Sequence, residues 1–136
     1  MKNNKDVAER LKYLNEEKQK QDERKRFYLR EIGKLKKLLF ENEKEIKYNE
    51  DWIAFHEKSA EKHRKRLSGM ANPDEKREQE AKLKFHIEQI ENHHKSYINY
   101  HKKEVEFLKR EVRIFEDGLK KCEEQIVFLD EKIRSL

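Results

Sequence analysis

The sequence predicts an all-α protein: a long antiparallel helical hairpin, coiled-coil-like, that pairs with a second copy to form an antiparallel four-helix bundle. Three observations support this fold class. Apolar residues recur at alternating spacings of three and four through both halves of the chain, which is the period of a helix with one buried face. Only one short segment breaks this pattern. Charged residues make up 46% of the chain and hydrophobic residues 34%, a composition that favours narrow buried seams over a rounded globule.

Length and composition indicate one folded domain. The chain has 136 residues, 10% of them aromatic, with one Pro and three Gly, and this aromatic content together with the long periodic pattern argues against disorder. We expect a single helical-hairpin domain over residues 1–136. Its first helix should cover about residues 5–67, its turn 68–73, and its second helix about 74–135.

The first helix carries a heptad repeat from Val7 to Leu67. Its apolar a positions are strongest in the middle, at Ile32, Leu39 and Ile46. Residues 15–26 contain no apolar side chain, so there the first helix either covers its partner with the stems of lysine and arginine or bends away from it.

The turn has a recognisable chemistry. Gly69 suits the left-handed conformation that often ends a helix. Asn72 offers an N-cap oxygen, Pro73 suits the first helical position, and Asp74 and Glu75 place negative charge at the start of the second helix. One helix is therefore expected to end here and another to begin.

The second helix has the most regular pattern, with apolar or seam positions from Ile98 to Leu136. Within it, Gly118 weakens the helix and permits a bend. Facing residues of an antiparallel pair should have numbers that sum to a constant. The apolar positions of the two helices meet this test, with sums of 143 for Leu14–Leu129, Tyr28–Phe115 and Leu35–Leu108 and of 144 for Ile32–Val112, Leu39–Val105 and Ile46–Ile98. Both sums place the reversal between Ala71 and Asn72.

One side of the predicted hairpin is apolar and aromatic. A two-stranded hairpin cannot bury this strip, and exposed apolar patches of more than a few hundred Å² usually mark an interface. We therefore expect a homodimer, or failing that another protein partner, to cover it. The expected interface residues are Phe27, Leu38, Tyr48, Trp52, Phe55, Ile90, Tyr97, Tyr100, Phe107, Ile114 and Phe128.

The six histidines lie between His56 and His101, which raises the question of a metal site. Carboxylate-bridged di-metal bundles need two Glu-x-x-His motifs, and the sequence has one, at Glu91 and His94. We therefore expect no metal ligands. The residues Asn42, Asn49, His56, His94 and His101 are instead expected to form polar layers that set the register of the helices. Partly buried histidines should also weaken the fold on acidification.

Basic residues suggest an alternative function. Lys and Arg exceed Asp and Glu by 34 to 29, for a net charge of +5, and the clearest basic cluster surrounds the turn. A basic accessory protein could contact DNA or RNA there. The candidate contacts are Lys62, Arg64, Lys65, Arg66, Lys76 and Arg77.

The remaining features favour a non-enzymatic protein. The sequence has no Gly-rich phosphate loop and no nucleophile motif, so we expect no catalytic residue, no cofactor and no small-molecule substrate. A single cysteine, Cys122, and the lack of a signal-like or membrane-length apolar segment suggest a cytoplasmic protein that does not enter a membrane. The expected function is a protein-binding module, such as a small regulator, adaptor, inhibitor or assembly factor.

Overall fold

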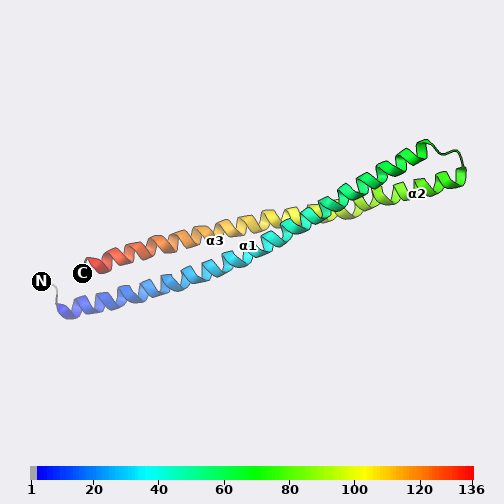
Figure 1. The fold of residues 1–136 in the computed structure, drawn as a ribbon. Coiled ribbons are helices and arrows are strands. Elements are labelled where there is room, and N and C mark those ends of the chain that lie inside the picture. Colours follow the sequence, from blue (N-terminus) through cyan, green and yellow to red (C-terminus); the bar gives the residue numbers. More distant parts are fainter. Residues whose placement is uncertain (1–2) are drawn as a thin grey trace. The chain divides into compact units, whose positions relative to one another are not determined.

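The protein is an all-α helical hairpin in the computed structural model, which describes residues 3–136 (Figure 1). Its first arm is helix α1 (Asn4–Ser68). Its second arm consists of α2 (Pro73–Gln89), the π-helical turn η1 (Ile90–His94) and α3 (Lys95–Arg134). Residues 3–136 contain no β-strand. The predicted fold class is confirmed at the level of one hairpin.

The hairpin divides into two compact units, each built from one segment of either arm. Unit 1 contains the chain up to Leu38 together with Leu108–Leu136, and unit 2 is Leu39–Phe107. The start of α1 and the end of α3 lie at the same end of unit 1 (Figure 1). The turn and η1 belong to unit 2.

The turn has the expected cap at the start of α2. Asn72 is extended, with φ −76° and ψ 124°, and its Oδ1 accepts hydrogen bonds from the backbone N–H groups of Asp74 and Glu75 at 2.9 and 3.4 Å. The expectation for Gly69 was wrong. No glycine among the described residues has a positive φ, and α1 ends with tight bonds from the N–H groups of Gly69 and Met70 to the carbonyls three residues earlier.

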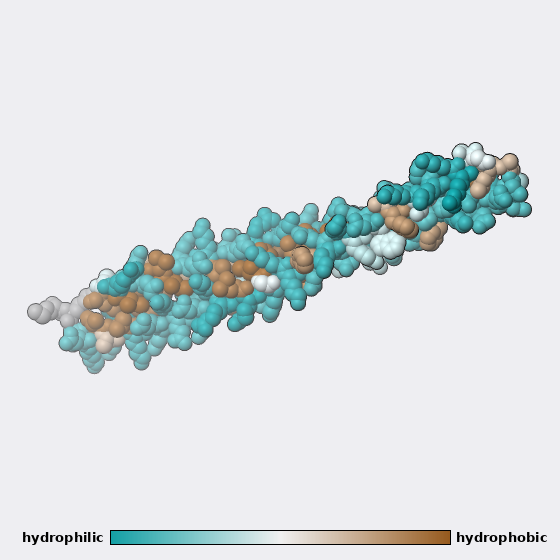
Figure 2. Space-filling model, in the orientation of Figure 1, coloured by the Kyte–Doolittle hydropathy of each residue, from teal (hydrophilic) through white to brown (hydrophobic). Residues whose placement is uncertain are grey.

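Unit 1 has an apolar seam in the predicted register. Leu14 and Leu129 are both buried, and the rings of Tyr28 and Phe115 lie 5.9 Å apart between centroids. Cys122 is a free, buried thiol within the same seam. Figure 2 shows brown apolar side chains along the face of this unit that is turned toward the viewer.

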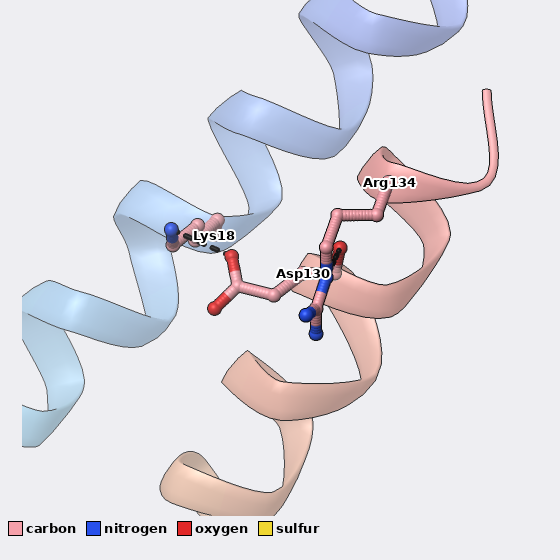
Figure 3. A network of polar contacts seen from close by, with 3 residues as sticks. All are labelled: Lys18, Asp130 and Arg134. Carbon is pink, nitrogen blue, oxygen red and sulfur yellow. Dashed lines mark hydrogen bonds and ion pairs between the residues drawn. The ribbon is translucent and has the colours of Figure 1, made fainter.

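The segment without apolar residues remains helical within α1 and contacts the second arm through an ion pair. Lys18 Nζ lies 2.6 Å from Asp130 Oδ1 (Figure 3). The Nε of Arg134 donates to the backbone carbonyl of Asp130, one turn back on α3, at 3.4 Å. The hydrogen bond and charge of Asp130 raise the pKa of the Lys18 ammonium. Lys18 therefore contacts the second arm through an ion pair at a heptad position that an apolar side chain usually occupies.

Gly118 provides room for an aromatic ring. A Cβ placed on Gly118 would lie 2.7 Å from Cζ of Tyr28. Helix α3 continues through this position, so the glycine produces no break between Lys95 and Arg134. Its role is to allow close packing of Tyr28, and the bend considered from the sequence does not interrupt the helix.

Candidate protein interface

Four polar pairs join α1 to the second arm in unit 2. Asn42 Oδ1 lies 2.7 Å from His101 Nδ1, and Asn49 Oδ1 lies 2.9 Å from His94 Nδ1. Since an amide oxygen can only accept, both histidines donate from Nδ1. The remaining pairs are His56–His86, with Nδ1 atoms 2.7 Å apart, and His63–Gln79, at 2.6 Å. The five expected members of the polar layers are confirmed as contacts, and His63, His86 and Gln79 are members beyond those five.

The spacing of these pairs reveals a register change. Along α1 the paired residues Asn42, Asn49, His56 and His63 are seven apart at every step. Their partners, His101, His94, His86 and Gln79, are separated by seven, eight and seven. The extra residue falls in η1, where the N–H of Lys95 donates to the carbonyl of Ile90, five residues earlier.

Side-chain spacing explains this wide turn. On the second arm, His86, Ile90, His94 and Ile98 all face α1 and are four residues apart. Each step of four turns an α-helix about 40° beyond a full rotation, so three successive steps would carry the seam away from its partner. The extra residue in η1 absorbs this drift. Three consecutive four-residue spacings between seam positions are the sequence signal that could have predicted η1.

The register change corrects one expected interface residue. Ile90 was placed on the aromatic strip, but it is buried in the seam with 8% exposure. A regular seven-residue repeat counted back from His94 and Ile98 would place Ile87 and Glu91 on the buried face, whereas the residue added in η1 places His86 and Ile90 there. Ile87, at 39% exposure, lies at the surface instead.

The other expected interface residues are exposed in both units. Unit 1 presents Phe27, Leu38, Ile114 and Phe128, and Phe27 also packs edge-to-face against Phe115 at 6.3 Å. Unit 2 presents six side chains that we call the aromatic surface. They are Tyr48, Trp52, Phe55, Tyr97, Tyr100 and Phe107. Figure 2 shows pale and light-brown side chains gathered on unit 2 within a mostly teal surface.

Aromatic contacts order the middle of this surface. Trp52 lies edge-to-face with Tyr48 at 6.3 Å and with Phe55 at 5.4 Å. Its face is parallel to the ring of His94, with an interplanar angle of 2° and centroids 6.1 Å apart. Because His94 is held by Asn49, the polar pair beneath the surface supports the tryptophan above it.

A groove of about 440 Å³ opens beside Trp52. Tyr48, Phe85, His93 and Tyr97 contribute further rings to its wall, and Glu45 contributes a carboxylate. Four segments supply these residues: α1, α2, η1 and α3. The side chain of Phe85 is a member that the sequence analysis did not place on this side, because its position depends on the register change at η1.

Burial disfavours the protonated form of three histidines in unit 2. The pKa values of His56, His86 and His94 are lowered, first by loss of solvent and then by repulsion from neighbouring imidazoles. His56 and His86 direct their Nδ1 atoms at each other, so one nitrogen must donate while the other accepts. These two rings could serve as a pair of metal ligands, but residues 3–136 contain no cluster of three or more His, Cys, Asp or Glu arranged for a metal ion.

The basic residues around the turn are all exposed. Arg64 forms an ion pair with Glu61 at 3.7 Å on its own helix. Acidic residues accompany the cluster on both arms, namely Glu57, Glu61, Asp74, Glu75, Glu78 and Glu80. The charge of this region is therefore more mixed than the basic residues alone suggest.

Comparisons with known protein families, with curated proteins and with solved structures find no match to this chain. Over the described part of the chain, no helix combines the length and the apolar character needed to cross a membrane.

Proposed function

We propose that this protein is a non-enzymatic, cytoplasmic protein-binding module that acts through the exposed aromatic side of its helical hairpin. Its first partner is a second copy of the same chain, in an antiparallel four-helix bundle. A free, buried Cys122 is compatible with a reducing compartment. A regulator, adaptor, inhibitor or assembly factor would use the same surface toward a different protein.

The main support is the imbalance between exposed and buried apolar side chains. Among the described residues, seventeen large hydrophobic side chains are exposed, whereas nine hydrophobic residues are buried. Single exposed apolar residues are normal, but clustered ones usually mark an interface. Six of the seventeen form the aromatic surface of unit 2. Covering them with a second hairpin would give these rings the burial that two helices cannot provide.

The polar pairs support a binding role by fixing which residues face outward. Each pair satisfies its hydrogen bond in one register only, and a slip of one residue would separate Asn49 from His94 and His56 from His86. The buried histidines and amides thereby have a structural role, which leaves the aromatic rings as the surface available for a partner.

Sedimentation of a quadruple variant tests the proposal. Trp52, Phe55, Tyr97 and Phe107 are replaced together by Ala, which preserves helix propensity. We expect the wild type to sediment at twice the 16.8 kDa mass of one chain and the variant at that mass, with helicity retained. The matched control is the double variant Ile87→Ala, Val127→Ala, which truncates exposed apolar residues outside the expected interface. An unchanged mass for the quadruple variant would remove the four-helix model.

A second candidate function is nucleic-acid binding at the turn, favoured by the exposure of all six candidate basic residues there. The accompanying acids reduce its attraction for phosphates. Titration of fluorescent duplex DNA and single-stranded RNA at two salt concentrations separates the candidates. Binding that weakens with salt and is lost in a Lys65→Ala, Arg66→Ala, Arg77→Ala variant would favour this function over the aromatic surface.

A further inference from the structure

The groove beside Trp52 is lined without any lysine or arginine. Lys and Arg account for 34 of the 136 residues, yet neither occurs among the ten residues that line the groove; its nitrogen-bearing rings are Trp52 and the histidines His56, His93 and His94. Among other grooves of similar size, Arg64 and Lys95 line one and Lys20 and Arg24 line another. A neighbouring groove that shares His93 and Tyr97 with this one also has no Lys or Arg. Glu45 is the single carboxylate at the groove beside Trp52. The wall of this groove therefore offers a carboxylate and no lysine or arginine side chain to a ligand.

The aromatic rings of the groove are groups that attract cations. The faces of Trp52, Tyr48, Tyr97 and Phe85 carry the negative side of the ring quadrupole, which attracts cations. His56 and His94 also line the groove, and burial lowers their pKa values, which favours the neutral imidazole over the charged one. His93 is a third imidazole in the wall. The Glu45 carboxylate adds attraction at the edge of the groove.

We propose that this groove binds the cationic side chain of an arginine or lysine presented by a bound protein. The inference rests on the proposed protein-binding function for the source of the cation. Arginine fits best, because its planar guanidinium stacks on aromatic faces while its N–H groups can bond a carboxylate. The protein would thus use an aromatic groove to recognise a basic residue within an otherwise apolar contact.

The groove is supported by contacts that do not depend on a partner. Asn49 donates through Nδ2 to the Glu45 carbonyl at 2.8 Å and accepts from His94 through Oδ1 at 2.9 Å. His94 in turn lies parallel to Trp52. His93, the neighbouring residue in η1, packs edge-to-face with Tyr97 at 4.9 Å. Binding therefore needs little rearrangement of the rings, which limits its entropic cost.

Trp52 is the single tryptophan of the chain, so its fluorescence reports on the groove directly. The full-length protein is titrated with N-acetyl-arginine amide and with N-acetyl-citrulline amide, its uncharged near-isostere. The protein is kept below the concentration at which sedimentation detects self-association, and ionic strength is matched with NaCl. We expect a saturable change with both probes and a dissociation constant at least about threefold lower for the arginine probe, the range of an exposed to partly desolvated cation–π contact.

A matched pair of charge variants identifies the contribution of the groove. Glu45→Gln should reduce the preference for arginine and leave citrulline binding unchanged. Glu57→Gln, on the same helix and lining a different groove, should change neither constant. Equal affinity for arginine and citrulline, or no saturable signal with either, would overturn the proposal. Stronger binding of tetramethylammonium than of the arginine probe would also overturn it, by assigning the groove to a small onium ligand.

Self-association is measured separately on the same samples by sedimentation. A monomeric chain that still distinguishes arginine from citrulline would support the groove while removing the homodimer. A dimer whose groove binds arginine and citrulline equally would support the homodimer and overturn the arginine site.

Discussion

His56 Nδ1 lies 2.7 Å from His86 Nδ1, so one hydrogen joins two imidazoles from opposite arms of unit 2. The pair requires at least one ring to accept through an unprotonated Nδ1. His63 contacts His86 and His94 contacts His56, with centroids 5.4 and 5.3 Å apart. Protonation of both His56 and His86 would therefore break the hydrogen bond between them and add repulsion between two positive charges.

Acidification should weaken the fold through these histidines. Their folded pKa values lie below the ordinary value of 6.5, so below that pH the unfolded chain binds more protons than the folded one. Stability is thus retained above pH 6.5 and lost as pH falls from there through the lowered values. Urea unfolding at pH 7.5 and 5.5 measures the difference.

The histidine contribution can be separated from that of the carboxylates. The double variant His56→Gln, His86→Gln keeps an amide hydrogen bond and cannot titrate, so its stability should fall less between the two pH values. Replacement of the exposed His93 by Gln should preserve most of the wild-type decrease. An identical decrease in the double variant and the wild type would contradict the assignment.

The two glycines within helices should respond oppositely to alanine. Nothing lies within 4 Å of a Cβ at Gly33, so Gly33→Ala should stabilise the protein by about 0.5–1 kcal/mol through helix propensity. At Gly118 the new methyl group would meet the Tyr28 ring at 2.7 Å, and Gly118→Ala should destabilise despite the same propensity gain.

Thermal unfolding of both variants measures these effects. Adding Tyr28→Ala to Gly118→Ala removes the overlap, so the destabilisation caused by alanine at position 118 should disappear in that background. Persistence of the loss without the Tyr28 ring would show that another property of Gly118 matters.

Removal of one residue should be tolerated within η1 and harmful in α3. Deleting the exposed Asn92 turns the π-helical turn into an α-helical one and brings the partners of Asn49 and His56 to a regular spacing of seven. Deleting the exposed Lys103 rotates the part of α3 before the deletion by about 100° relative to the part after it, so the two parts no longer present one buried face to α1. We expect cooperative unfolding near the wild-type midpoint for the first deletion and a loss of cooperativity for the second, measured by circular dichroism. Similar damage from both would argue against η1 as a register adjustment.

The Lys18–Asp130 ion pair should be visible in the titration of the lysine. Asp130 raises the Lys18 pKa above the ordinary 10.5, so this contribution to stability is complete below that pH and is lost as pH rises through the folded value. Asp130→Asn should lower the pKa of Lys18, as measured by NMR of its side chain. A Glu17→Gln variant, whose carboxylate pairs with Lys20 instead, is the control and should leave it unchanged.

The apolar periodicity of the sequence was enough to predict the two helical arms, the position at which the chain reverses and the residues that face each other in unit 1. Tyr28 and Phe115, placed opposite each other by their numbers, have their rings in contact. Asn72, Pro73 and the two following acids predicted the start of α2, because capping chemistry is local. The polar positions on α1 were also found from the heptad, as was most of the exposed aromatic side.

Tertiary packing decided the features that depend on how one arm fits the other. The wide turn at η1 compensates the drift of successive four-residue steps along the second arm, and it places Ile90 in the seam and Phe85 at the groove. Close approach of Tyr28 gave Gly118 its role, and Asp130 gave Lys18 a partner across unit 1. A heptad assigns each residue to a face of its own helix, whereas the neighbour on that face depends on register. Register, in turn, is set where side chains from both arms meet.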